Sequence, residues 1–176
     1  MKTKSIVSNI SPYTFGLVMM FALVAILAGC VNTTEPTPEP RFESEARENH
    51  MKNALQQYID GFNQGDAAML IALFADNAKI EDPVGGGRVV KGKEAITAFY
   101  QRAVTMVERL ELDTPIRGSY GHSAAMAFTI HLKKNGEKKI IQAIDVMTFD
   151  DSGKIIDMKA FHGPSNASER IPTVRP

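Results

Sequence analysis

The sequence predicts an α+β domain in which three N-terminal helices pack on a curved, mainly antiparallel sheet. Two patterns lead to this prediction. Apolar residues recur at helical spacing through residues 51–62 and 93–106, whereas long segments after residue 107 alternate at strand spacing. The chain of 176 residues has a hydrophobic fraction of 44%, which is enough for one core. We therefore expect one folded domain of ordinary size at residues 44–167.

Three helices are expected at the start of this domain. The first begins near Ser44, and its apolar stripe consists of Met51, Leu55, Tyr58, Ile59 and Phe62. Gly65 ends this helix, and Asp66 can cap a second helix at residues 67–75. The third helix covers residues 93–106. Its inward-facing residues are Ile96, Phe99, Tyr100 and Ala103.

Strand patterns fill most of the remaining domain. A first strand at residues 78–84 closes at Pro83, and a short strand follows the glycine-rich turn at residues 85–88. Four longer strands are expected at residues 108–120, 122–134, 139–149 and 155–163. The Asn-Gly pair at residues 135–136 is a hairpin signal between two of them.

Asp145 lies on an apolar face of the strand at residues 139–149. Alternation gives this face the neighbours Ile141, Ala143, Met147 and Phe149. An ionised carboxylate there is costly unless it is paired, and the usual outcome is a raised pKa and a neutral acid. The opposite face of the strand is also largely apolar and needs a cover. A second copy of the chain is the simplest cover, so we expect a homodimer.

Two further polar groups point inward by periodicity. Tyr58 lies on the apolar stripe of the first helix, and Asp82 shares a strand face with Ile80 and Val84. If helix and sheet close on each other, both can meet Asp145 in one pocket. A structural role remains open for each of the three. Tyr58 can be a core tyrosine with a satisfied hydroxyl, and Asp82 a turn residue before proline. Asp145 can be a buried acid bonded to a backbone amide.

The stretch LQQYIDGFNQGDAAMLIALFADNAKIEDPVG at residues 55–85 resembles the opening of bacterial ketosteroid isomerases, which have the NTF2-like (SnoaL-like) cone fold. The resemblance continues through AITAFY, AAMAFTI, IDVMTFDDSGKIIDMKA and GPSN, and covers residues 47–167. The EDPVG motif implies that Asp82 is the catalytic aspartate. The Gln-x-Tyr motif implies Tyr58 as the phenolic donor, with Tyr100 supporting it.

The resemblance also implies that Asp145, after Ala-Ile, is the protonated aspartic acid of this family. The implied reaction is a cofactor-free isomerisation of a 3-oxo-Δ5 steroid, or a similar small apolar ketone, to the conjugated enone. Asp82 would carry the proton from C4 to C6, while Tyr58 and Asp145 would hydrogen-bond the dienolate oxygen. The apolar pocket is expected to contain Met126, Phe128, Met158 and Phe161.

His162 departs from the family pattern, because a bulky aromatic residue stands at this place in other members. A histidine can donate or accept a hydrogen bond and so can change substrate preference, but an exposed strand-end residue is equally consistent. No metal-ligand spacing is found for His50, His122, His131 and His162. The sequence has 20 basic and 20 acidic residues, so it lacks the excess of positive charge that is typical of nucleic-acid-binding proteins.

Three other functions stay open at this point, because the cone fold has many uses. One is a different enolising reaction. Another is a lipid-tethered protein that binds a small apolar ligand in the periplasm without turnover. The third is a structural dimer module, which is disfavoured by three polar groups that face inward.

The N-terminal segment is typical of an export signal. Lys2 and Lys4 precede an apolar run at residues 15–29, which is short for a membrane-spanning helix. The run ends in Leu-Ala-Gly-Cys, which resembles the lipobox of bacterial lipoproteins. This implies a signal peptide at residues 1–29, cleavage before Cys30 and lipid on that residue. An uncleaved anchor helix is the alternative.

The lipobox implies a lipid-anchored protein of the bacterial cell envelope. Val31 follows the cysteine where an aspartate is expected for retention at the inner membrane, so we expect the periplasmic face of the outer membrane. Residues 30–43 are rich in Pro, Thr and Glu and are typical of a solvated tether, and residues 168–176 form a tail. Cys30 is the only cysteine, which excludes a disulfide within one chain.

Overall fold

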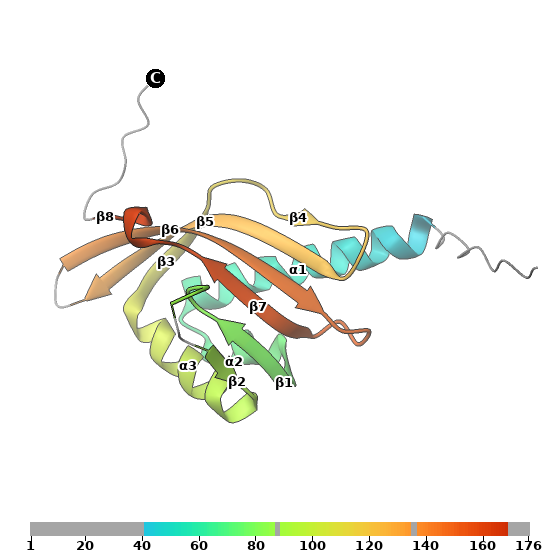
Figure 1. The fold of residues 1–176 in the computed structure, drawn as a ribbon, viewed down its shortest axis with the longest axis horizontal. Helices are drawn as coiled ribbons and strands as arrows, with labels where there is room; N and C mark the ends of the chain where they lie inside the picture. The colour runs from blue at the N-terminus through green and yellow to red at the C-terminus, as the bar shows by residue number, and fades with distance from the viewer. Residues whose placement is uncertain (1–40, 87–88, 135–136, 169–176) are drawn as a thin grey trace, which may run out of the picture. The chain divides into compact units, whose positions relative to one another are not determined.

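Figure 1 shows the computed structural model of the chain, which describes residues 41–86, 89–134 and 137–168. Several predictions fall outside these ranges: the signal peptide, Cys30, most of the tether, the Asn-Gly turn and residues 169–176 of the tail. Within the described ranges, no helix is both long enough and apolar enough to cross a membrane.

Three helices pack on one face of the sheet, as predicted (Figure 1). They are α1 (Arg41–Gln64), α2 (Ala67–Ala72) and α3 (Lys93–Met106). The side chain of Asp66 caps α2 by accepting a hydrogen bond from the backbone N–H of Met69 at 3.0 Å. Helix α1 begins earlier than predicted. Helix α2 ends earlier, because Phe74 pairs with Ile155 of another strand and so belongs to the sheet.

The sheet is curved and mixed, and most of its strand pairs are antiparallel. Its strands are β1 (Phe74–Glu81), β2 (Val89–Lys91), β3 (Val107–Leu112), β4 (Arg117–Gly118), β5 (Ser123–Lys134), β6 (Glu137–Phe149), β7 (Ile155–Phe161) and β8 (Ala167–Ser168). The strand order is β2-β1-β7-β6-β5-β3, with β4 beside β5 and β8 beside β6. Strands β1 and β7 form a parallel pair. The predicted α+β class and mainly antiparallel sheet are confirmed.

Most predicted strands have somewhat different bounds in the structure, such as β7, which ends at Phe161 instead of residue 163, and two of them differ more. The segment at residues 108–120 was expected to be one strand, but it forms β3 and β4 with an interruption that contains Pro115. Proline has no backbone N–H to give to the neighbouring strand β5. The first strand ends at Glu81, so that Asp82 and Pro83 lie in the loop that follows it.

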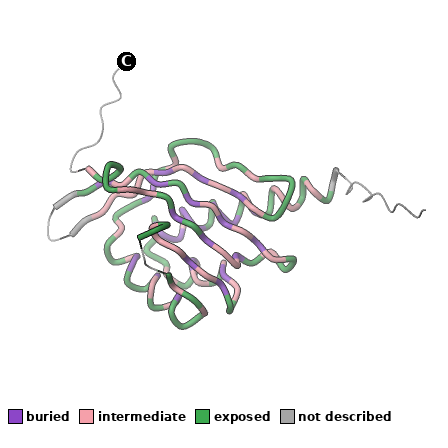
Figure 2. Tube along the Cα trace, in the orientation of Figure 1, coloured by how far each residue is buried: buried purple, intermediate pink, exposed green. Residues whose placement is uncertain are grey.

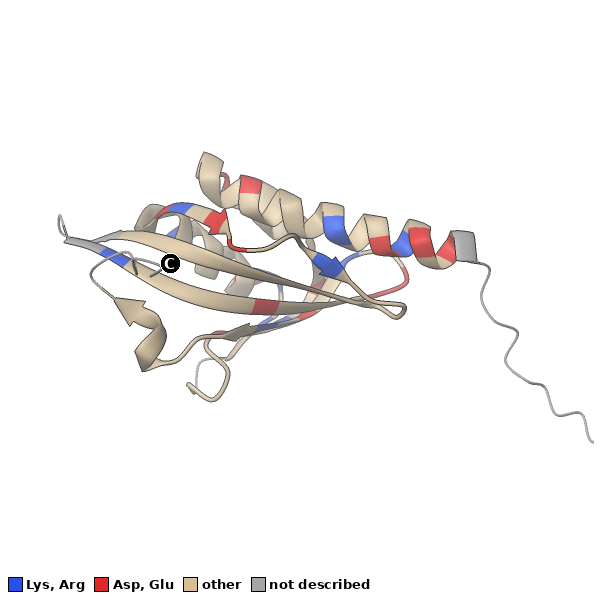
Figure 3. Cartoon of the chain, turned by 90° about the horizontal axis from the view of Figure 1, so that it is seen from above, with Lys and Arg blue, Asp and Glu red and all other residues tan. Residues whose placement is uncertain are grey.

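The core lies between the helices and the sheet, as the buried segments in Figure 2 show. Asp145 is 1% exposed and is the one buried acidic residue in the described part of the chain. On the other face of the sheet, Ile144 is 50% exposed and Phe161 is 46% exposed. Basic and acidic residues are interspersed along α1 (Figure 3), so this helix presents no surface of a single charge.

Candidate active site

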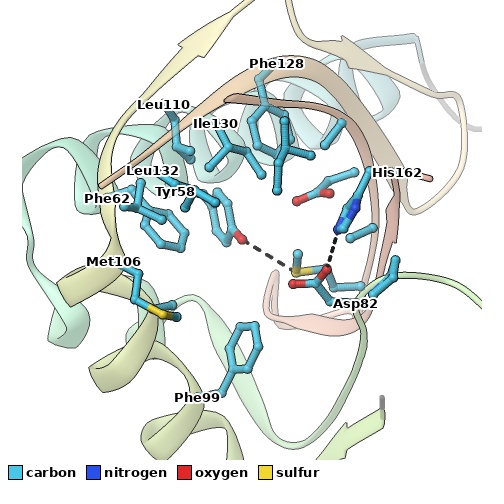
Figure 4. Close-up of a pocket in the computed structure, with 18 of the residues that line it drawn as sticks. Tyr58, Phe62, Asp82, Phe99, Met106, Leu110, Phe128, Ile130, Leu132 and His162 are labelled. Atoms are coloured by element: carbon cyan, nitrogen blue, oxygen red, sulfur yellow. Dashed lines mark hydrogen bonds and ion pairs between the residues drawn. The ribbon is translucent and has the colours of Figure 1, made fainter. Parts of the chain in front are cut away.

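A cavity of about 390 Å³ opens between α1, α3 and the sheet. This volume lies in the range of small-molecule sites, about 300–1,000 Å³. Its walls are mainly apolar, and Figure 4 labels among them Phe62, Phe99, Met106, Leu110, Phe128, Ile130 and Leu132. The polar and charged side chains in its walls are Tyr58, Asp82, Arg102, Asp145 and His162. The structure therefore brings the three candidate catalytic residues to one cavity.

Tyr58 reaches the cavity from the apolar stripe of α1 and is 4% exposed. Its hydroxyl donates to the sulfur of Met158 at 3.9 Å, which is a long contact to a weak acceptor. Burial raises the pKa of Tyr58 well above its usual value, and the neighbouring Tyr100 acts in the same direction. The phenol therefore keeps its proton and can donate a hydrogen bond to a stronger acceptor in the cavity.

Tyr100 stands behind Tyr58 on α3 and is fully buried. Its hydroxyl donates to the same sulfur of Met158 at 3.4 Å, and the two phenol rings meet edge to face with centroids 6.0 Å apart. Burial raises the pKa of Tyr100 well above its usual value. Tyr100 does not line the cavity, so its place agrees with the predicted supporting position behind Tyr58.

Asp145 lies in the middle of β6, opposite Met126 of β5 and Ala160 of β7. Burial raises the pKa of its carboxyl well above the usual value, and the charge of Asp82 adds to this rise. Its Oδ1 atom is buried and bonds to no described residue. A neutral carboxylic acid whose polar atom lacks a partner is costly in a core unless a ligand supplies the missing hydrogen bond.

Asp82 lies where the chain leaves β1, directly before a cis peptide bond to Pro83. Its side chain is 30% exposed, unlike that of Asp145. The loop is fixed to β7 by the backbone N–H of Val84, which donates to the carbonyl of Ala160 at 2.8 Å. The cavity therefore contains one partly exposed carboxyl group, that of Asp82, and two buried, protonated groups, Tyr58 and Asp145. This difference in exposure makes Asp82 the candidate base and the other two the candidate hydrogen-bond donors.

His162 contacts Asp82 directly, with its Nε2 atom 3.0 Å from Oδ1 of the carboxylate (Figure 4). His162 directly follows β7 and continues the alternation of Met158 and Ala160, so that all three residues line the cavity. The side chain is 20% exposed, so the alternative of an exposed strand-end residue is wrong. No sequence pattern could show the contact, since the two residues are brought together by the pairing of distant strands.

Of the residues predicted for the substrate pocket, Phe128, Met158 and His162 line the cavity, whereas Met126 and Phe161 do not. Phe161 points to the outer face of the sheet, because it is an odd number of residues from Met158 on the same strand. Met126 is 2% exposed and packs in the core instead of lining the cavity.

Several cavity residues were missed from the sequence. Leu110, Ile130, Leu132 and Arg102 line the cavity, as do Phe62 and Phe99, which were recognised as inward-facing but not as part of the pocket. A signal was present for some of them. Ile130 and Leu132 alternate with Phe128 on β5, and Arg102 follows Phe99 by one helical turn.

This geometry suits the removal of a proton next to a carbonyl group. The carboxylate of Asp82 can take the proton, and two O–H donors, Tyr58 from α1 and Asp145 from β6, can stabilise the oxygen that becomes negative. Within the described ranges, no cluster of His, Cys, Asp or Glu side chains could hold a metal ion.

The chain is similar to known proteins over the same region. A SnoaL-like domain matches residues 55–158. The chain is 36% identical over 116 residues to a steroid Δ-isomerase from Nocardioides simplex, which covers 66% of this chain and 92% of that protein. The chain is also similar to a solved structure of SalBIII, an epoxide hydrolase/cyclase-like enzyme of pyran ring formation in the polyether salinomycin. The two sequences are 29% identical and the structures superpose with a TM-score of 0.62. The match covers 68% of this chain and 95% of SalBIII.

These similarities support the conclusion that the protein is an enzyme with an activity of the isomerase or cyclase type. The matched regions include Tyr58, Asp82 and Asp145, so the likeness extends to the walls of the cavity. By the domain match and by its identity to the isomerase, the chain belongs to the SnoaL-like family.

Proposed function

We propose that the protein isomerises a β,γ-unsaturated ketone, such as a 3-oxo-Δ5 steroid, to the conjugated enone without a cofactor. One observation carries the proposal. The buried Oδ1 of Asp145 has no partner among the described residues, and it lines the same cavity as the donor Tyr58 and the carboxylate of Asp82. The likeness to the steroid Δ-isomerase supports this choice of reaction.

In the proposed mechanism, Asp82 takes a proton from C4 of the substrate. The electron pair of the broken C–H bond moves toward C3, and the negative charge collects on the C3 oxygen of a dienolate. Tyr58 and Asp145 each donate a hydrogen bond to that oxygen. Asp82 then returns the proton to C6, so that no proton is gained or lost overall and one residue acts as base and as acid.

The walls of the cavity fit a substrate that is largely hydrocarbon. Phe62, Phe99 and Phe128 line the cavity, and a bound hydrocarbon substrate would displace water from the reacting atoms, which strengthens hydrogen bonds to a developing charge. Arg102 is the one lysine or arginine among the described lining residues, so most of the substrate surface would meet apolar side chains.

Turnover is tested by adding 5-androstene-3,17-dione to the purified protein and following the ultraviolet absorbance of the conjugated enone. We expect turnover in the wild type and a loss of about 10²–10⁴-fold in Asp82→Asn, the usual contribution of general-base catalysis. The matched control is Asp76→Asn, which removes an exposed carboxylate outside the cavity and is expected to retain activity. Equal activity in both variants would exclude Asp82 as the base.

Binding without turnover is the competing function. A protein that only captures apolar ligands would bind a phenolic steroid, which imitates the dienolate, and would convert no ketone. In that case Asp82→Asn would leave the affinity for the ketone unchanged.

We also propose that a second copy of the chain covers the outer face of the sheet. The exposed apolar side chains of this face are Val84, Ile144 and Phe161. Apolar patches of this kind often mark protein contacts. The lipid on Cys30 and the envelope location remain proposals from the sequence.

A further inference from the structure

We propose that His162 is a positioning residue that holds the Asp82 carboxylate in its working orientation by donating a hydrogen bond from Nε2. This inference rests on the proposed function and adds a residue to it. The resemblance to ketosteroid isomerases suggests an aromatic residue that packs on the substrate at this place. In this chain the side chain contacts the candidate base.

The hydrogen bond occupies one oxygen of the carboxylate and leaves the other available. Nε2 of His162 lies 3.0 Å from Oδ1 of Asp82. No described residue bonds to Oδ2, and Figure 4 shows this second oxygen on the side of the cavity where Tyr58 lies. An imidazole with its proton on Nε2 can therefore fix the rotation of the carboxylate while one oxygen stays free to take a proton.

The end of β7 holds Asp82 at two points. The carbonyl of Ala160 accepts the backbone N–H of Val84 at 2.8 Å, which fixes the loop, and His162 fixes the side chain. Asp82 needs such support because it lies beyond the end of β1, in a loop whose next residues Val84, Gly85 and Gly86 are exposed. An orientation that is fixed before the substrate arrives lowers the barrier without adding a contact to the substrate.

The other polar groups of the cavity do not replace this contact. Tyr58 donates to the sulfur of Met158, and among the described residues the side-chain hydrogen bond of Asp82 is the one with His162. Arg102 lines the cavity and forms no ion pair with a described residue. His162 is thus the neighbour that can orient the base.

The first test is a nuclear magnetic resonance measurement that does not depend on turnover. In protein labelled with nitrogen-15, we expect Nε2 of His162 to carry a proton, whether the ring is neutral or charged. The variant Asp82→Ala removes the acceptor, and the Nε2–H signal should move or exchange faster with water. A wild-type ring that is protonated only on Nδ1 would overturn the proposal, and so would a signal that is unchanged in Asp82→Ala.

The second test separates positioning from packing by comparing His162→Phe with His162→Gln. The phenylalanine removes the donor and keeps an aromatic ring, and a lost hydrogen bond to a charged group is expected to lower kcat by roughly 10- to 100-fold with little rise in KM. The glutamine keeps an N–H near the position of Nε2 and should recover part of this loss. Circular dichroism checks that both variants are folded.

Two kinetic outcomes would contradict the proposal. If both variants lose kcat equally, the imidazole N–H is not the feature that matters. If His162→Phe changes KM alone, the residue acts on the substrate and not on Asp82. In an Asp82→Asn background, His162→Phe should have no further effect on kcat, because the two residues act as a unit.

Failure of the proposed function can be distinguished from failure of this inference. If the wild type converts no ketone, isomerisation is excluded for that substrate. The NMR comparison of wild type with Asp82→Ala still decides whether His162 holds the carboxylate.

Discussion

Replacing Asp145 by Asn should change how the stability of the protein depends on pH. Burial raises the pKa of Asp145 well above its usual value, so the folded state keeps its proton at pH values where the unfolded chain has lost it. Folding stability contributed by this group is fully present below the unfolded pKa and is lost as the pH rises toward the folded pKa. Asparagine has no proton to lose, so the variant should not show this loss.

As long as the folded carboxyl keeps its proton over the whole pH range compared, the size of the effect depends only on the unfolded pKa, about 3.9 for aspartate. As the pH rises from about 4.5 to about 5.5, the free energy of unfolding of the wild type should fall by about 1.2 kcal/mol relative to that of Asp145→Asn. For a folded region of about 130 residues, this corresponds to a relative change in Tm of about 4–5 °C. Thermal unfolding followed by circular dichroism at one protein concentration measures it.

A control of opposite sign is available in the turn between β6 and β7. The pKa of Asp150 is lowered by hydrogen bonds from Ser152 and from the backbone of Lys154. Its contribution is present above the unfolded pKa and lost as the pH falls, so Asp150→Asn should lose stability relative to the wild type as the pH rises. If Asp145→Asn and the wild type show parallel changes in Tm, the carboxyl is not held neutral and the reasoning about the site is wrong.

Two further predictions concern the tyrosines and the outer face of the sheet. Tyr58→Phe should lower kcat by about 10²–10³-fold, as for other lost oxyanion donors, whereas Tyr100→Phe should have a smaller effect because Tyr100 does not line the cavity. Equal losses in the steady-state assay would contradict these positions. Phe161→Asp should convert the proposed dimer to a monomer in sedimentation velocity, because the side chain is 46% exposed on the outer face. A mass equal to that of the wild type would exclude this face as the interface.

The sequence was sufficient to predict elements whose pattern is local. The third helix at residues 93–106 and the burial of Asp145 follow from periodicity, and both agree with the structure. The cavity position of Tyr58 and Asp82 also follows from patterns that point inward, once helix and sheet are assumed to meet.

The remaining features depend on pairings between distant segments. The contact of His162 with Asp82 requires the parallel register that places Ile80 beside Met158, and no local pattern contains this register. The error at Phe161 has a simpler cause, because strand alternation already excludes a shared face for residues 158 and 161.

The alternation of side chains in the second half of β7 affects how this protein can diverge. The even-numbered residues Met158 and Ala160 line the cavity, whereas the odd-numbered residues Lys159 and Phe161 are exposed. Substitutions at the even positions can alter the chemistry while the outer surface is conserved, and the reverse also holds. A one-residue insertion within the strand would exchange both sets for every residue after it, so selection should tolerate substitutions in this strand far better than changes in its length.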